Sequence, residues 1–121
     1  MRDCTKFYID GQWQMPSDAE TMDVINPATE EVCARISLGN QDDVDRAASA
    51  ATRAFASYGI GNKNERIELF ESIVAEYEKR YSDVADAISE EMGAPKTLAV
   101  KYQAGAGVAH LQAALQLLKE F

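Results

Sequence analysis

The stretch from Tyr102 to Leu118, near the end of the chain, contains no Asp, Glu, Lys or Arg. Its larger apolar residues recur at helical spacing, at Val108, Leu111, Leu115 and Leu118. Alanines cover much of the remaining surface, and a helix that is apolar over most of its surface needs neighbours on several sides. The chain must therefore pack helices together, and this last helix requires more apolar contact than a single neighbour provides.

Two earlier helices begin at clear capping signals. Asn40 and Asn62 are each followed three positions later by an acidic residue, Asp43 and Glu65, as in a capping box. The first of these helices is expected to end at Gly59-Ile60-Gly61. The predicted apolar stripes are Val44, Ala47, Ala48, Ala51, Ala54, Phe55 and Tyr58 in the first, and Ile67, Phe70, Val74, Tyr77 and Tyr81 in the second.

A third, short helix is predicted to start at Ser82 and to stop at Gly93 and Pro95. The last helical segment follows it, from Thr97 to Phe121. Gly105-Ala106-Gly107 lies in this segment and resembles the start of a dinucleotide fingerprint. No apolar strand precedes it and no acidic residue follows at the required distance, so a close helix contact is the favoured interpretation.

The N-terminal part of the chain has the pattern of strands. Two short aromatic-rich runs flank Asp10-Gly11, a pair that tolerates positive φ and favours a tight hairpin. A second pair of apolar runs, 22–25 and 32–36, is separated by the turn sequence Asn26-Pro27-Ala28-Thr29-Glu30. We therefore predict two hairpin-like units in residues 1–38, followed by a helical part in residues 39–121.

Composition narrows the possible functions. The formal net charge is −8, with 46% hydrophobic and 26% charged residues, which is typical of a globular chain. An acidic chain repels phosphate backbones and anionic lipid, so neither a nucleic-acid nor a membrane role is expected. No secretory leader and no apolar run of membrane-spanning length is visible, which favours the cytoplasm.

The residues by themselves form no catalytic constellation. Cys4 lies in a terminus expected to be mobile and Cys33 in a predicted strand, and neither has a nearby histidine in the sequence. Structural thiols are favoured over reactive ones, because a reactive thiolate needs a cationic neighbour or a helix N-terminus. His110 is the sole histidine, which disfavours a zinc site. The acidic residues Asp83, Asp86 and Glu90 share one helix face that is more typical of solvated surface than of paired catalytic acids.

The ordered set of short motifs resembles the N-terminal segment of the NAD(P)-dependent aldehyde dehydrogenase superfamily. The order and spacing of these motifs fit along nearly the whole chain. The matching stretches are Phe7-Tyr8-Ile9-Asp10-Gly11-Gln12-Trp13, Ile25-Asn26-Pro27-Ala28-Thr29-Glu30-Glu31-Val32, Asp42-Asp43-Val44-Asp45-Arg46-Ala47, Ala50-Ala51, Ala54-Phe55, Glu65-Arg66 and Glu90-Glu91-Met92-Gly93-Ala94-Pro95.

The resemblance implies an α/β fold in which these helices belong to an incomplete Rossmann-type cofactor-binding domain. It implies oxidation of an aldehyde to a carboxylic acid through a cysteine thiohemiacetal, with NAD or NADP accepting the hydride and a glutamate as base. The family's catalytic and cofactor motifs match no position of this sequence. We therefore expect no catalytic and no cofactor-binding residue in this segment, and no cofactor bound to it alone.

One family site is partly represented. Some members hold a structural monovalent cation with backbone carbonyls near the Asn-Pro turn and an acidic residue just before a Gly-x-Pro sequence. The corresponding positions here are Val24, Ile25 and Glu91. Oxygen ligands suit a hard cation, but a strand end and a helix end without an ion are an equally good interpretation.

Two functional hypotheses follow. In the first, the chain is the scaffold segment of a cytoplasmic, homo-oligomeric aldehyde dehydrogenase, inactive alone, whose partner is the remainder of the enzyme. In the second, it is a stand-alone α+β interaction module that self-associates through the uncharged last helix. The resemblance favours the first hypothesis.

Overall fold

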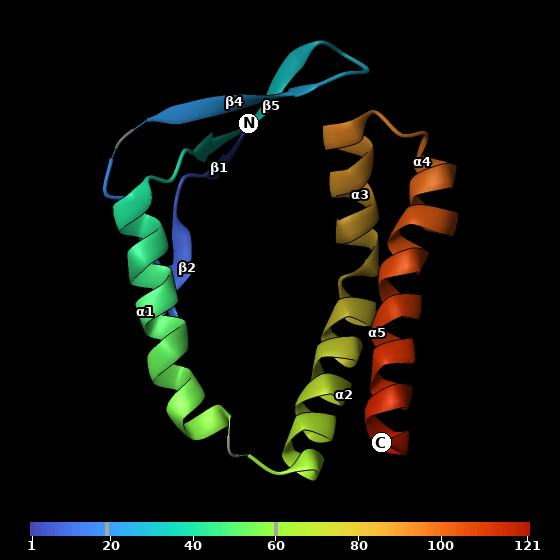
Figure 1. Cartoon of the computed structure of the whole chain (residues 1–121). Helices are drawn as coiled ribbons and strands as arrows, with labels where there is room; N and C mark the ends of the chain where they lie inside the picture. The colour runs from blue at the N-terminus through green and yellow to red at the C-terminus, as the bar shows by residue number, and fades with distance from the viewer. Residues whose placement is uncertain (19, 60) are drawn as a thin grey trace. The chain divides into compact units, whose positions relative to one another are not determined.

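Figure 1 shows the computed structural model of the chain, which describes residues 1–18, 20–59 and 61–121. The chain divides into two compact units, Met1–Ile60 and Gly61–Phe121. Every strand in the described residues lies in the first unit together with helix α1, whereas the second unit is helical. Each unit is described by itself below.

The first unit contains a three-stranded sheet in the order β1-β5-β4. Strands β4 (Thr21–Asn26) and β5 (Glu31–Ser37) form the predicted antiparallel hairpin. Its turn is closed by the Glu30 amide, which donates to the Asn26 carbonyl at 2.8 Å, with Glu30 at φ 60°. Strand β1 (Arg2–Cys4) pairs parallel with β5, so the expectation of a mobile terminus at Cys4 is wrong. A strand of three residues is too short to show the alternation of apolar and polar residues by which strands are predicted. Its partner strand also lies more than 30 residues away in the sequence.

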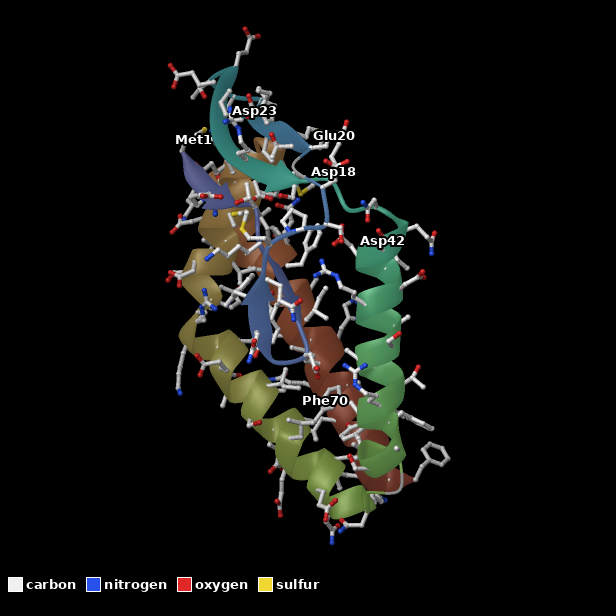
Figure 2. The ribbon with its side chains drawn as sticks, turned by 90° about the vertical axis from the view of Figure 1, so that its left-hand side faces the viewer. Met1, Asp18, Glu20, Asp23, Asp42 and Phe70 are labelled. Carbon is white, nitrogen blue, oxygen red and sulfur yellow. The ribbon has the colours of Figure 1, made fainter. Side chains whose placement is uncertain are left out.

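A separate two-stranded hairpin joins β2 (Phe7–Ile9) to β3 (Gln12–Gln14). Asp10 and Gly11 form its turn with φ values of 54° and 75°, which confirms the prediction made from this pair. The hairpin lies alongside α1 (Gln41–Tyr58), as Figure 2 shows. An ion pair between Asp10 and Arg53, at 3.0 Å, joins the turn to the helix.

Helix α1 begins at the predicted Asn40 cap, and the capping box with Asp43 is complete. At its other end Gly59 has φ −61°, a right-handed conformation, so the glycine is not required for a left-handed cap. A Cβ there would instead lie 2.6 Å from the backbone carbonyl oxygen of Phe55 and 2.8 Å from its ring, and the approach of the backbone favours glycine. Ile60, the middle residue of the predicted stop, lies outside the described residues.

The apolar stripe predicted on α1 is only partly covered. Ala50 is buried on the side that faces the β2–β3 hairpin. The larger side chains of the stripe remain open, with Val44, Phe55 and Tyr58 exposed by 58%, 69% and 53%. Helix α1 therefore carries an apolar face that the described residues of the first unit leave uncovered.

The second unit packs α5 (Ala104–Glu120) beside α2 (Lys63–Lys79) and α3 (Tyr81–Met92), as Figure 1 shows. Helix α2 begins at the predicted Asn62 cap. Helix α3 starts one residue before the predicted Ser82 and ends, as predicted, at Gly93, whose φ is 68°. A short α4 (Lys96–Leu98) and a π-helical segment η1 (Ala99–Gln103) lead directly into α5. The sequence predicted this last helix but not its π turn.

The buried centre of the second unit consists of alanines. Ala85, Ala99 and Ala104 are completely buried, and Tyr81, Val84 and Ile88 pack around them. The predicted apolar face of α5 is partly buried, but its alanines at 106, 109, 113 and 114 are exposed and Leu117 is 54% exposed. Among the described residues no large side chain is completely buried. The last helix thus has one covered face where its composition requires several.

Candidate functional site

A buried carboxylate, Asp43, lies in the first turn of α1 with only 3% of its surface exposed. Its Oδ1 accepts hydrogen bonds from the Ser17 amide at 2.9 Å and the Ser17 hydroxyl at 3.0 Å. The Arg46 guanidinium also donates to Oδ1, while Oδ2 accepts from the Asn40 amide at 3.1 Å. One side chain therefore joins the start of the helix to a segment that precedes both strands of the β4–β5 hairpin.

These contacts determine the ionisation of Asp43. Burial by itself would raise the pKa of this carboxyl group. The amides of Asn40 and Ser17, together with the Arg46 guanidinium, outweigh burial and lower the pKa to about 2. Donors aimed at both oxygens favour the charged form, because they stabilise the carboxylate directly. Asp43 is therefore ionised at neutral pH, and with so low a pKa its carboxylate is a weak proton acceptor.

Arg46 extends the same network along the first unit. Its guanidinium also donates to the Gln14 side chain at 3.4 Å and to the Met15 carbonyl at 3.3 Å. A hollow of about 340 Å³ opens beside it between α1 and the hairpin, lined by Ile9, Asp10, Gln14, Asp45, Arg46, Ser49 and Arg53. The two arginines face two carboxylates of the same hollow, so it offers no net charge for an ionic ligand. The arrangement suits a structural clamp, formed by Asp43, Arg46 and Ser17.

The two cysteines have different environments. Cys33 is buried in β5, and its Sγ donates to the Val24 carbonyl of β4 at 3.3 Å. Cys4 is exposed in β1, and both thiols are free. His110 is an exposed residue of α5 in the other unit. The bonded Cys33 thiol agrees with the structural role that the sequence favoured for it.

The predicted cation ligands come from different parts of the chain. Val24 and Ile25 are consecutive residues of β4, and the ladder register shifts between them. Beside them, a hydrogen bond from Arg35 at 2.7 Å lowers the pKa of Asp23, so the charge of this carboxylate is paired with a guanidinium. Glu91 is an exposed residue near the end of α3, in the second unit. Because the three positions belong to different units, the site stays a prediction.

The glycine motif of the last helix accommodates tyrosine side chains. A Cβ on Gly105 would lie 3.3 Å from the Tyr81 hydroxyl, and one on Gly107 would overlap the Tyr77 hydroxyl. No strand precedes the motif in the second unit, whose described residues are helical. The close contact expected at these glycines is therefore one with aromatic side chains of α2 and α3.

Two features of these sites escaped sequence reasoning. The capping box identified Asp43, but nothing local indicated that Ser17 also bonds to it. The π turn and its two tyrosine hydroxyls were equally hidden, although the glycines at 105 and 107 were a signal that something approaches the helix closely. Within the described residues, no cluster of three His, Cys, Asp or Glu side chains forms a metal site.

Comparison with known proteins identifies the family. The sequence model of the aldehyde dehydrogenase family matches residues 13–121. The chain belongs to the aldehyde dehydrogenase family. It is 45% identical over its whole length to a 3-succinoylsemialdehyde-pyridine dehydrogenase of a Pseudomonas species, and covers 26% of that protein.

Solved structures of aldehyde dehydrogenases share this fold. The crystal structure of the aldehyde dehydrogenase from Bartonella henselae matches the whole chain with a TM-score of 0.98 and 44% identity, and 25% of that protein is covered. Aldehyde dehydrogenase C from Pseudomonas syringae, solved as a mutant in complex with NAD+ and octanal, matches 98% of the chain. Its TM-score is 0.95 at 38% identity, with 24% of that protein covered.

These matches confirm the predicted α/β class and the assignment to an N-terminal segment of an aldehyde dehydrogenase. The chain spans about a quarter of the length of the relatives that it matches. In the part of the chain that the structure describes, no helix has the combined length and apolar character needed to cross a bilayer. The division at residues 38 and 39 into two structural parts stays a prediction.

Proposed function

We propose that this aldehyde dehydrogenase segment is a scaffold for an enzyme that oxidises an aldehyde to a carboxylic acid with NAD(P)+. The observation that carries the proposal is the 45% identity to a semialdehyde dehydrogenase over the whole chain. The surface of the segment supports a scaffold role. Large apolar side chains of α1 are exposed, and so is much of α5, although the composition of α5 is that of a buried helix. The remainder of the enzyme is the partner that would cover them.

The catalytic thiol and the base belong, on this proposal, to residues outside this segment. Cys33 is a poor nucleophile because its proton is held on the Val24 carbonyl inside a sheet. When bound, the nicotinamide cofactor accepts the hydride, and this segment supports the domain that holds it. The alternative, a self-associating module, is not favoured, because the relatives match as parts of longer dehydrogenases.

Enzyme assays of the complete protein test this proposal. We expect formation of NADH or NADPH with an aldehyde substrate, and no activity from the isolated segment. The variants Cys4→Ser and Cys33→Ser of the complete protein should keep their rates within about twofold, since neither thiol has the activation that covalent catalysis requires. Loss of activity in either variant, with the fold retained, would contradict the assignment of catalysis to other residues.

We also propose that Val24, Ile25 and Glu91 contribute to a monovalent cation site in the complete enzyme. The irregular ladder between Val24 and Ile25 supports it, because a bulge turns a carbonyl away from its strand partner. Val24 already accepts the Cys33 thiol, but a carbonyl oxygen has a second lone pair for a cation.

Thermal unfolding in different salts tests the cation site. At constant ionic strength, K+ or Na+ should raise the Tm of the complete protein relative to a bulky organic cation, because an ion bound only by the folded state stabilises it. The Glu91→Gln variant should lose most of this difference. An identical salt response in the variant would remove Glu91 from the site.

Three further properties follow from family membership. We propose that the complete protein is a homo-oligomer, that it is cytoplasmic, and that its cofactor is either NAD or NADP. Light scattering of the complete protein measures the first, and cell fractionation the second. Initial rates with each cofactor at equal concentration decide the third.

A further inference from the structure

The helix that ends the second unit contains an unusual hydrogen-bond step. At the end of the π turn η1, the Ala104 amide donates to the Ala99 carbonyl, five positions back. In a regular α-helix the same amide would donate to the Val100 carbonyl, four positions back. In the π turn, the Val100 carbonyl therefore does not receive the Ala104 amide, which would be its donor in an α-helix.

A side chain from a neighbouring helix supplies the replacement. The hydroxyl of Tyr81, the first residue of α3, donates to the Val100 carbonyl. One turn earlier along the chain, the Tyr77 hydroxyl of α2 donates to the Ala104 carbonyl at 3.1 Å. Both hydroxyls thus bond to backbone at the π turn, one within it and one just after it.

The surroundings of the turn fit these two hydroxyls closely. Ala99 and Ala104, at the two ends of the π-type hydrogen bond, are completely buried. Gly105 leaves room for the Tyr81 hydroxyl, and Gly107 leaves room for that of Tyr77. Small residues at these four positions allow α2 and α3 to approach the helix at the point where its register changes.

We propose that the Tyr81 hydroxyl sets the register of the last helix. With the hydroxyl present, the extra residue of the π turn is retained and the Ala104 amide bonds to Ala99. Without it, the Ala104 amide donates to the Val100 carbonyl, as in a regular α-helix. One residue corresponds to about 100° of helix rotation and about 1.5 Å of rise. The contact therefore decides which residues of α5 face α2 and which remain open.

A double-mutant cycle tests the proposal in the complete protein. Tyr81→Phe removes the hydroxyl, and deletion of Lys101, an exposed residue of the turn, removes the extra residue. In the undeleted chain, Tyr81→Phe should lower the hydrogen-exchange protection of residues 99–108 roughly tenfold, because the helix loses the contact that fixes its register. In the deleted chain the same substitution should change protection by less than about twofold. Equal losses in the two backgrounds would overturn the proposal.

Tyr102→Phe is the matched control. It removes a hydroxyl from the same turn, but this tyrosine is 58% exposed. We expect no change in protection, and a loss as large as that of Tyr81→Phe would overturn the proposal, because the effect would then not be specific to the Tyr81 hydroxyl.

A crystal structure of the Tyr81→Phe protein decides the matter even if the deleted chain does not fold. An Ala104 amide bonded to the Val100 carbonyl supports the proposal. An Ala104 amide still bonded to Ala99 overturns it, because the π turn would then persist without the hydroxyl.

Discussion

Replacing Asp43 by asparagine is expected to raise the hydrogen-exchange rates of the Ser17 and Asn40 amides roughly 10- to 100-fold in the complete protein. The carboxylate accepts from donors on both oxygens, with Ser17 and Arg46 at Oδ1 and Asn40 at Oδ2. Asparagine has one acceptor oxygen, so its NH2 group must face a donor at one of the two positions. Either orientation leaves a donor unpaired in a buried site, and the Arg46 guanidinium loses its counter-charge.

The same substitution should change the pH dependence of stability. The pKa of Asp43 is about 2 in the folded protein against an ordinary value of 3.8. Because the folded-state pKa is depressed, the carboxylate stabilises the fold above about pH 4, and this contribution is lost as the pH falls toward 2. The Tm difference between the native protein and Asp43→Asn should therefore be largest near neutral pH and narrow below pH 4.

Asp42→Asn provides the control, since it removes the same charge from the same helical turn. Asp42 is exposed, and Figure 2 marks it at the start of α1. We expect exchange at Ser17 and Asn40 to stay within about threefold of the native protein, because a surface charge near a helix N-terminus has a small effect. Equal effects of the two substitutions would mean that Asp43 acts through its charge on the helix and not through its hydrogen bonds.

Local signals in the sequence predicted the elements of this fold well. The cap residues Asn40 and Asn62, and the turn residues Asp10 and Gly11, act over three or four positions and need no distant partner. The hydrogen bonds that define each element are formed within the same short stretch. Such signals predict a cap or a turn independently of the contacts made by the rest of the chain.

Features that depend on distant residues were missed. Strand β1 exists because its three residues pair with β5, and Ser17 reaches Asp43 only after the chain has folded back. The π turn is a further case, since its register involves a tyrosine at the start of a different helix, α3. The family resemblance could not supply these contacts either, because motifs identify positions and not the partners that meet there.

The candidate cation site shows the same limit. The sequence supplied Val24, Ile25 and Glu91 by resemblance, but two of them lie on a strand of one unit and the third on a helix of the other. Strand and helix patterns describe each unit separately. They carry no information on which oxygen ligands of one unit meet those of the other.

Substituting Gly107 by alanine is expected to destabilise the second unit, although alanine is the better helix former. A Cβ at this position would overlap the Tyr77 hydroxyl and lie 2.8 Å from its Cζ. Overpacking of this kind costs about 1–3 kcal/mol, whereas the gain in helix propensity is about 1 kcal/mol. Since the Tyr77 hydroxyl is held on the Ala104 carbonyl, the ring cannot move away without losing that bond.

The sign of the effect should depend on Tyr77. Leucine at position 77 lacks the hydroxyl, the Cζ and the Cε atoms that a Cβ on Gly107 would meet. In the Tyr77→Leu background, Gly107→Ala should therefore become stabilising, by the ordinary advantage of alanine over glycine of about 1 kcal/mol. Urea denaturation followed by circular dichroism, on all four members of the cycle in the complete protein, measures the coupling. If Gly107→Ala is still destabilising with leucine at position 77, the added Cβ clashes with another group. The close approach of Tyr77 would then not be the reason for glycine at position 107.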